Sequence, residues 1–571
     1  MGGVILADAA FQVINRAGKW LRWKYYLSPR FQDFEDHLIM PPRTELRENA
    51  FRQEINGDLR RRPPCRCLDC RCRLRKLGLK TVIFEAGSDI GGTWRWKCYP
   101  GAGVDSEVPE YMLSIPETWK DWTWLTNYPS YGELHQYFDH VDNVLQIKKD
   151  TAFSSVVFYA KFDTSRGRWH IRTADGRSAQ ARYFIVATGF SAKRYIPEWP
   201  GMDRFKGIVH HSSFWPDEHI DVGGKRCAVI GTGASGVQVT QAWGPQAASL
   251  RVFQRTPNLA LPIRNVTLPN QKKPIPNYFH SAKSFGGFLY TFHERDTFDD
   301  NEEERQTFFV RLWEEGGFRF WLANYKDYLF NAKANRRVYE FLTRERIGDP
   351  KQRDILAPLE LPHYFGVKSP ALQSTSYEQF NRPNVEAIDI KPNGISRFTE
   401  NGIQLQDGTV YELDIICIAT GFDIATGGMT NVGLKSIYGT ELEKEWKSGP
   451  IHTSAPRCVG IPTCSICTDH MGRWIAHAIK QMERKDIKYI NPTHEAVEKW
   501  KKRINRLSEI TLFPTVKSTY LGGNVPGKAF EQVNYAGGEP AYVNEIRAVL
   551  PSFDGFEVVK GTREASQLSK I

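Results

Sequence analysis

The feature that most constrains the fold is a glycine-rich turn at residues 231–236, Gly-Thr-Gly-Ala-Ser-Gly. An apolar run, Arg226–Ile230, precedes it and a helix-compatible run follows it. A lone GxGxxG is weak evidence, but a strand before it and a helix after it make it strong. The glycines permit a tight turn and let backbone and helix N-terminus approach a pyrophosphate. We therefore predict a dinucleotide-binding fold of the α/β class here.

The next predicted strand, Leu250–Phe253, indicates which dinucleotide binds. An acidic residue after this strand would bond the ribose 2′-hydroxyl of NADH, but here Gln254, Arg255 and Thr256 follow. A guanidinium pairs with a 2′-phosphate in forked geometry, whereas a carboxylate repels it. The sequence thus predicts NADPH. The alternative is that Arg255 is only a solvated surface charge.

A second dinucleotide-binding fold is predicted around Thr81–Glu85, with Glu85 in the ribose-binding place. Two further β-type runs, Tyr183–Gly189 and Leu413–Gly421, both end in Ala-Thr-Gly. Apolar runs of this kind are typical of parallel sheets covered by helices. We therefore predict two Rossmann-like domains of the α/β class. Residues 275–350, rich in aromatic and charged side chains at helical spacing, are predicted to form a helical insertion.

The glycine turn of this other fold is missing from its expected place. Gly231 lies 23 residues before Gln254, and the same spacing before Glu85 gives Arg62, Pro64 and Cys67 instead of glycines. Proline has no N–H for a phosphate, and residues 56–61 are too polar for a buried strand. Cys65, Cys67, Cys70 and Cys72 could form a thiolate metal site. We favour wrong-frame or mis-spliced sequence over residues 56–72, because four cysteines in eight residues do not match zinc-site spacing.

Composition limits the classes of binding partner and the cellular location that we expect. The net charge is +11, concentrated in arginines of residues 43–80, and no nucleic-acid motif accompanies it. No apolar run is long enough for a membrane span, and residues 1–26 do not resemble a signal peptide. We expect them to form a surface helix, the alternative being membrane-surface contact. With its ten cysteines, such a chain is expected in the reducing cytoplasm.

Two further segments carry a family resemblance. Phe205–Pro216 matches FxGxxxHxxxW(P), the first fingerprint, and Gly91–Asp105 matches GGxWxxxxYPGxxxD, the second fingerprint. Over roughly residues 73–545 the chain resembles the Baeyer–Villiger monooxygenases, class B flavin-dependent enzymes, and within them the fungal members of secondary metabolism. The resemblance implies that NADPH reduces FAD and that the reduced flavin takes up O₂. The resulting flavin peroxide attacks a ketone, giving an ester or lactone.

The resemblance also implies site residues. Asp105, Ser369, His211 and Trp215 occupy catalytic or coupling positions, with Asp105 orienting a cation that stabilises the peroxide. Lys368 would hold the NADPH 2′-phosphate. The cofactor-binding positions are Glu85, Gly92, Thr93, Trp94, Arg95, Trp96, Val104, Asp105, Tyr111, Gly231, Thr232, Gly233, Ala234, Ser235, Gly236, Gln238, Arg255, Thr256 and Lys368.

The domains expected from this resemblance are discontinuous. Residues 1–50 form a helical extension and 546–571 a tail. The FAD-binding domain comprises 51–190 and 386–545, disrupted at 56–72 and 450–461. Residues 191–385 form the NADPH-binding domain.

The sequence departs from the family pattern at several places. Ser369 stands where the family has the peroxide-stabilising arginine, so Asp105 is expected to lose its partner. Thr519 replaces a tryptophan beside the nicotinamide, and residues 450–461 are too short and polar for a flavin-facing strand. Cys464, Cys467 and His470 are interpreted as the remnant of a helix start. The rival hypothesis is a catalytically inactive, decayed or misannotated member that retains at most NADPH binding. The aromatic insertion favours a bulky apolar ketone.

Overall fold

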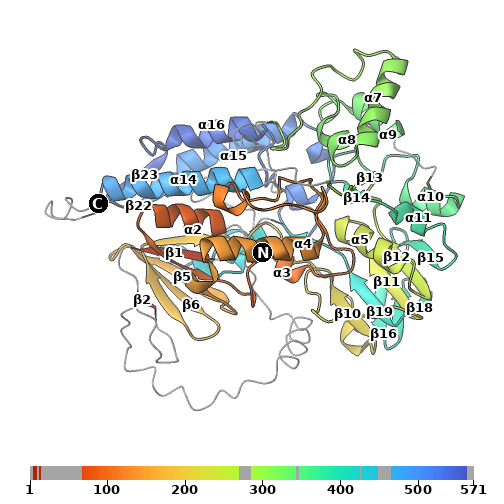
Figure 1. Ribbon diagram of the computed structural model, residues 1–571, viewed down its shortest axis with the longest axis horizontal. Helices are drawn as coiled ribbons and strands as arrows, with labels where there is room; N and C mark the ends of the chain where they lie inside the picture. Colours follow the sequence, from red (N-terminus) through yellow and green to blue (C-terminus); the bar gives the residue numbers. More distant parts are fainter. Residues whose placement is uncertain are drawn as a thin grey trace.

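The computed structural model describes residues 4–8, 12–13, 67–268, 284–341, 346–424, 426–447 and 465–561. Two sheets lie at opposite ends of an elongated molecule (Figure 1). One end carries the glycine turn and the helical insertion, and the other carries Glu85 and the long C-terminal helices. Among the described residues, no helix is long and apolar enough to cross a membrane.

The sheet that carries the glycine turn is entirely parallel. Its strands, in spatial order, are β10 (Ile208–His211), β19 (Ile415–Ile418), β11 (Arg226–Ile230), β12 (Ser249–Gln254) and β15 (Val385–Asp389). The core residues of β11 and β19 are buried, as expected for a sheet covered on both faces. The domain boundary predicted near residue 385 does not separate the two sheets, because β15 and β19, which follow it, both pair within this sheet.

The other sheet has the order β4 (Thr151–Ala152), β3 (Lys80–Phe84), β1 (Val4–Asp8), β8 (Tyr183–Val186). β3 and β4 are parallel, but β1 runs antiparallel to both of its neighbours, β3 and β8. The prediction of a helix over residues 1–26 is therefore wrong at 4–8. The short apolar run Val-Ile-Leu-Ala suits an inner strand, and β1 pairs with β3 on one side and β8 on the other.

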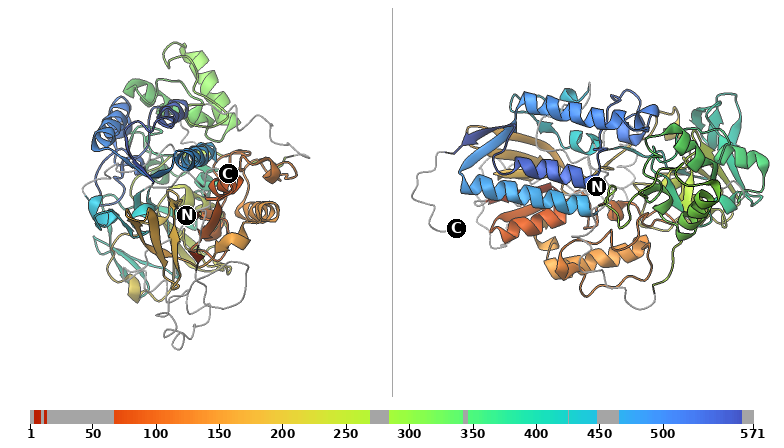
Figure 2. Two further views of the ribbon diagram at one scale, coloured as in Figure 1. Left: turned by 90° about the vertical axis from the view of Figure 1, so that its left-hand side faces the viewer. Right: turned by 90° about the horizontal axis from the view of Figure 1, so that it is seen from above.

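Helix α2 (Cys67–Lys76) is the predicted crossover helix. It begins at Cys67, inside the stretch 56–72 that was expected to be disrupted. Leu68, Cys70 and Leu74 are buried, and α2 lies alongside α14 (Ser465–Arg484) (Figure 2). Residues 68–71, assigned above to the disrupted stretch, are thus buried in the structure. Arg62, Pro64, Cys65 and residues 450–461 lie outside the described residues, as does most of the 1–50 extension.

The remaining elements cover the sheets and join them. A third, mostly antiparallel sheet has the order β2 (Gln12–Val13), β7 (Ser178–Ala181), β6 (Arg168–Thr173), β5 (Val157–Asp163), β21 (Leu434–Lys435), and only β21 runs parallel to its neighbour β5. The connection between the two ends of the molecule passes through the pair β9 (Lys193–Arg194) and β20 (Phe422–Asp423). The smaller strand sets are β13 (Ala260–Pro262) with β14 (Ala371–Gln373), and β16 (Ile395–Thr399) with β17 (Gly402–Leu405) and β18 (Val410–Glu412).

Helices complete the layers. They are α3 (Thr93–Trp96), α4 (Tyr131–Leu145), α5 (Ala234–Trp243), α10 (Pro350–Leu356), α11 (Ser376–Gln379), α12 (Thr426–Thr430), α13 (Leu442–Glu445), α15 (His494–Glu509) and α16 (Glu539–Val549). The 3₁₀ turns include η6 (Thr519–Leu521). The C-terminal tail predicted from residue 546 is wrong up to 560, because α16 continues to Val549 and β23 (Phe556–Lys560) pairs with β22 (Ile487–Pro492).

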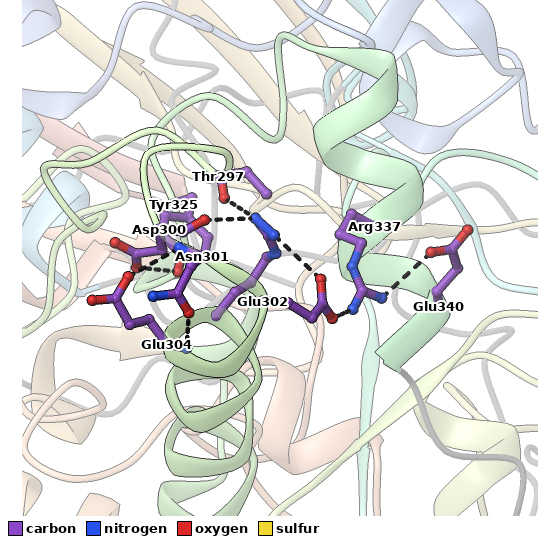
Figure 3. Close-up of polar contacts among 9 residues, drawn as sticks. Thr297, Asp300, Asn301, Glu302, Glu304, Tyr325, Arg337 and Glu340 are labelled. Atoms are coloured by element: carbon purple, nitrogen blue, oxygen red, sulfur yellow. Dashed lines mark hydrogen bonds and ion pairs between the residues drawn. The ribbon is translucent and has the colours of Figure 1, made fainter.

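The helical insertion contains α7 (Glu302–Glu315), α8 (Arg319–Leu322) and α9 (Ala332–Phe341). A capping box begins α7: the Asn301 side chain accepts from the Glu304 N–H at 3.0 Å, and the Glu304 carboxylate accepts from the Asn301 N–H at 2.9 Å (Figure 3). Glu302 joins α7 to α9 through an ion pair with Arg337.

The aromatic side chains of the insertion pack against one another. Phe320 stacks on Phe341 with ring centroids 5.4 Å apart and meets Phe309 at 5.7 Å. Phe309 and Phe320 are fully buried. These rings form a core of the insertion, so they are no evidence for a bulky substrate.

Candidate functional site

The second fingerprint follows β3 in the chain and forms a turn and then the short helix α3. Gly91 and Gly92 have φ of 116° and 52°, which favours glycine at both positions. They deliver Thr93 and Trp94 into α3, where the Trp94 ring meets Tyr111 edge-on at 5.8 Å. The Trp94 carbonyl is 3.0 Å from His135 Nε2 of α4. These contacts hold the segment Thr93–Trp96, which the resemblance assigns to the flavin, in place.

The two fingerprints contact each other directly. Arg95 forms an ion pair with Asp217 at 2.8 Å, just beyond the end of the first fingerprint. The Cys98 thiol donates to the Trp215 carbonyl at 3.4 Å, and Trp96 stacks on Phe214 at 5.8 Å. Both segments, more than a hundred residues apart in sequence, are thus joined by an ion pair, a hydrogen bond and a ring stack.

The second fingerprint also docks on helix α5, which follows the glycine turn. Tyr99 donates to Gln238 at 2.7 Å and accepts from Ser235 at 3.0 Å, while the Gln238 amide donates to the Gly103 carbonyl at 3.1 Å. A Cβ on Gly101 would lie 2.7 Å from the Gln238 carbonyl, so the contact requires glycine. Gln238, expected at a cofactor, therefore positions one segment against the other.

The glycine turn has the form that a pyrophosphate needs. Gly231 has φ of 112°, and a Cβ there would lie 2.5 Å from the Ala419 carbonyl. A Cβ on Gly236 would lie 2.0 Å from the Gly231 carbonyl. Helix α5 starts at Ala234 with Gly233 as its N-cap, and no side chain caps it. The N–H groups of residues 232–236 are therefore available to an anion.

Two cations lie beyond the carboxyl end of β12. Gln254 is buried and donates to the Ile355 carbonyl at 2.6 Å, so it turns away from a ribose. Arg255 is exposed and Lys368 is half-buried. Burial lowers the pKa of Lys368, and the nearby Arg255 charge lowers it further. Within the described residues neither cation forms an ion pair, so the pair fits a dianionic 2′-phosphate.

Glu85 stands at the carboxyl end of β3, where the second nucleotide is expected. It is buried, and its carboxylate accepts from the Gly87 N–H at 2.7 Å. Burial raises its pKa to about 8, against the lowering effect of that hydrogen bond. α2 runs back along β3 through the turn at Gly78, so the helix N-terminus lies at the same edge as Glu85. These features fit the ribose and phosphate of FAD.

Strand β1 does not complete that nucleotide site. Its first residue, Val4, pairs with Phe84 and Val186, while its last, Asp8, pairs with Lys80. A phosphate turn belongs at the carboxyl ends of parallel strands. β1 ends at the opposite edge, so this strand does not lead to the Glu85 edge.

Asp105, at the end of the second fingerprint, is half-buried and accepts from the Tyr111 hydroxyl at 3.0 Å. Burial raises its pKa, while the Tyr111 hydrogen bond and the Lys97 charge lower it. The neighbouring Val104 is fully buried. Ser369 brings no charge to Asp105, and the loss of a cationic partner from position 369 stays a prediction.

Ser369 lies near this group. Its carbonyl accepts a hydrogen bond from the Asn258 side chain at 3.0 Å. Its side chain forms a hydrogen bond with Tyr520, which lowers the pKa of Tyr520, whereas the Asp105 charge raises that pKa. Position 369 thus contacts Tyr520 with a neutral side chain. Thr519 begins η6, the turn that also carries Tyr520.

His211 and Trp215 are packed rather than open. His211 is fully buried, with Nδ1 2.9 Å from the Ser213 hydroxyl, and its ring meets Phe422 of β20 edge-on at 5.7 Å. Trp215 packs between His210 and Trp243. His211 thus contacts β20 at the connection between the two sheets, and the burial of both side chains favours positioning over contact with substrate.

The cysteine and histidine groups form no described metal site. His470 pairs with Glu539 at 2.9 Å, and α14 begins at Ser465, consistent with a helix start. Across the described ranges no group of three or more His, Cys, Asp or Glu side chains is placed to hold a metal ion.

Sequence reasoning did not single out three residues that connect segments of the site: Lys97, Tyr99 and Phe422. Lys97 and Tyr99 lie inside the second fingerprint, and Phe422 comes directly after the Ala-Thr-Gly end at 419–421. A lysine eight residues before Asp105 was the available signal. Only the tertiary structure shows that Lys97, Phe422 and His211 form a continuous set of contacts.

Comparison with known proteins agrees with this geometry. A family model described as flavin-binding monooxygenase-like matches residues 67–260. The FAD-binding monooxygenase acrE of Aspergillus aculeatus is 54% identical over 517 residues, covering 86% of this chain and 87% of that protein. Cyclopentanone 1,2-monooxygenase of Comamonas sp. is 38% identical, covering 83% of this chain and 90% of that protein.

Two solved structures share the fold over most of the chain. OTEMO in complex with FAD and NADP has a TM-score of 0.82 at 28% identity, covering 87% of this chain and 98% of that chain. An oxidized steroid monooxygenase bound to NADP has a TM-score of 0.80 at 31% identity, covering 87% and 98%.

Proposed function

This chain belongs to the flavin-binding monooxygenase-like family, and from that premise we propose that it acts as a Baeyer–Villiger monooxygenase. It uses FAD and NADPH to insert one oxygen atom of O₂ next to a ketone carbonyl, giving an ester or lactone. The proposal rests above all on one observation, the docking of the second fingerprint on helix α5 through Tyr99, Ser235 and Gln238. That contact sets the flavin-side segment against the glycine turn.

Each part of the chain has a stated task. When bound, FAD supplies hydride acceptance and oxygen transfer, which no side chain provides. The turn at 231–236 and the cations Arg255 and Lys368 hold NADPH, and Glu85 bonds the FAD ribose. Trp94 and Trp96 line the flavin side. Asp105 and Tyr111 fix charge beside it, where preorganised groups stabilise developing charge most effectively.

We assign the domains accordingly. Residues 67–190 and those after about 420 make the FAD-binding part, and 191–418 make the NADPH-binding part with its insertion. The pairing of β15 and β19 with β11 and β12 supports this shift from the boundary at 385. The ketone is a small-molecule substrate whose identity the site does not fix. A cytoplasmic location accords with Cys227 and Cys417, which remain thiols within buried strands.

The reaction is tested with labelled oxygen. The full chain, supplied with FAD, NADPH and ¹⁸O₂, is incubated with cyclic and open-chain ketones, and products are analysed by mass spectrometry. We expect an ester or lactone carrying one ¹⁸O atom, formed only when NADPH is present. A ketone panel that yields only hydroxylated products, or no product while NADPH is consumed, contradicts the assignment.

One observation favours a second candidate, a chain that binds NADPH without flavin turnover. Strand β1 runs antiparallel between β3 and β8 and so offers no phosphate turn at the Glu85 edge. The two candidates differ in the flavin content of the purified protein. Stoichiometric FAD supports the monooxygenase, and NADPH binding in a colourless protein that stays colourless with added FAD supports the second.

A further inference from the structure

A cleft of about 690 Å³ lies between helix α14 and the C-terminal end of helix α16, which pack against each other (Figure 1). None of its lining residues belongs to the flavin or NADPH positions named above, and among the described residues that line it there is no carboxylate. Most of the lining is basic. The basic residues of this cleft, called the basic cleft below, include Arg473, His477, Lys480, Arg484, Lys485 and Arg547.

The wall between the two helices is built by hydrogen bonds to the end of α16. The Trp474 indole N–H donates to the Ile546 carbonyl at 2.9 Å. The Gln481 amide donates to the Leu550 carbonyl at 2.8 Å. The last carbonyls of a helix have no partner within the helix and carry partial negative charge, which repels an anion. Because donors from α14 satisfy these carbonyls, the end of α16 presents less negative charge to the cleft.

A histidine positions Arg547 at one end of the cleft. The Arg547 guanidinium donates to His470 Nδ1 at 3.4 Å, and His470 Nε2 lies 2.9 Å from the Glu539 carboxylate. A guanidinium only donates, so Nδ1 accepts and Nε2 carries the ring proton toward Glu539. Arg473 is neutralised by Asp469 at 2.6 Å. Arg547 has a neutral partner instead, and among the described residues no carboxylate pairs with it.

Three more charges at the other end of α14 lack a counter-ion. Lys480 and Arg484 are exposed and four residues apart, so they lie on one face of the helix about 5–6 Å apart at their Cβ atoms. The Lys485 ammonium donates to the Pro551 carbonyl at 2.8 Å. In the part of the chain that the structure describes, none of the three forms an ion pair. Together with Arg547 they give the cleft an uncompensated positive charge.

We propose that the basic cleft binds an acidic peptide segment of a partner protein. Carboxylates on alternate residues of an extended peptide lie about 7 Å apart, close to the spacing of the cations along α14. Adjacent phosphates of a polyphosphate lie closer together than this. The Trp474 ring is buried and offers no open face on which a nucleobase could stack. The inference goes beyond the proposed function and does not depend on it.

The chain's own acidic run, residues 299–304, does not suit the basic cleft of a second copy. Its carboxylates at Asp300, Glu302 and Glu304 already bond within the helical insertion (Figure 3). A partner segment whose carboxylates are free complements the cleft instead.

Binding is measured by fluorescence anisotropy on the full chain, with a short fluorescein-labelled peptide of alternating glutamate and alanine as the probe. Lys480→Glu combined with Arg484→Glu should weaken binding by about 10-fold or more, because two attractive pairs become repulsive. Lys480→Gln with Arg484→Gln removes the charges without reversing them and should weaken binding less. Circular dichroism should show all variants folded, since both side chains are exposed.

The matched control is Lys351→Glu with Lys391→Glu, which makes the same change in net charge at two exposed lysines beside the parallel sheet. This control should bind the peptide as the unaltered chain does. Equal weakening in the control and in the cleft variant would mean that only net charge attracts the peptide, and it overturns the proposal. Failure of the unaltered chain to bind the peptide overturns it as well.

The place and chemistry of binding are tested by coupling and competition. Carbodiimide joins a bound peptide carboxylate to a nearby lysine amine with loss of water, and mass spectrometry then locates the amide. We expect coupling at Lys480 and Lys485, whereas coupling confined to lysines outside the cleft contradicts the proposal. Unlabelled peptide should displace the probe better than inorganic triphosphate or oligothymidylate does. Better displacement by either of these, or a dimer of the unaltered chain that the cleft variant abolishes, would assign the cleft to another occupant and overturn the proposal.

Discussion

Cofactor preference is set at the scale of single residues, beyond the carboxyl end of β12. Arg255→Ala should weaken NADPH binding by about 1.5–3 kcal/mol, the range for hydrogen bonds to charged groups, or roughly 10–100-fold in Kd. NADH binding should be nearly unaffected, because NADH has no 2′-phosphate. Titration calorimetry with both nucleotides measures this. Lys391→Ala, an exposed lysine just beyond the neighbouring strand β15, is the matched control. Equal losses for both nucleotides would contradict the assignment of NADPH.

The place of a site residue was predictable where it lies at a fixed spacing from a strand. The glycine turn, Glu85 and Arg255 each follow the strand after which the sequence placed them. Lys97 was not predictable, because it occupies a variable position of the fingerprint. Its contact with the Phe422 ring depends on the approach of β20 to the segment after α3, which no local pattern encodes.

At the scale of the element, the start of α7 offers a clean test of local design. Asn301→Ala removes the cap and should destabilise the first turn of α7 by about 1 kcal/mol. Hydrogen exchange of the peptide spanning residues 301–306, followed by mass spectrometry, should become faster. Asn301→Asp keeps a capping oxygen and should exchange like the unaltered chain. Unchanged exchange in Asn301→Ala would show that the Glu302–Arg337 pair, seen in Figure 3, suffices to hold this turn.

Element type followed from the sequence where runs were long or flanked by turns, as in β11, β12 and α5. It failed for β1, because an apolar run of four residues does not distinguish helix from strand. Sheet membership failed for β15 and β19 for a different reason. The repeated Ala-Thr-Gly ends suggested equivalent strands, yet strand partners are fixed by the order of crossovers, and β19 enters between β10 and β11.

At the scale of the whole molecule, function depends on two sheets held in one arrangement. The Arg95–Asp217 pair, the Tyr99–Gln238 bond and the β9–β20 pair all join the two ends. The α/β class with two nucleotide-binding parts was predictable from spacing. The contacts between the parts were not, since they join residues far apart in the chain.

The most direct test of the account is the visible spectrum of the bound flavin. The full chain is purified, loaded with FAD if required, and mixed with NADPH in the absence of oxygen. We expect the yellow absorbance to bleach within the time of a turnover, more slowly with NADH, and to return when O₂ is admitted. A chain that binds FAD stoichiometrically but is not bleached by NADPH, or that binds NADPH but never holds FAD, would contradict the central claim that both nucleotides act together across these two sheets.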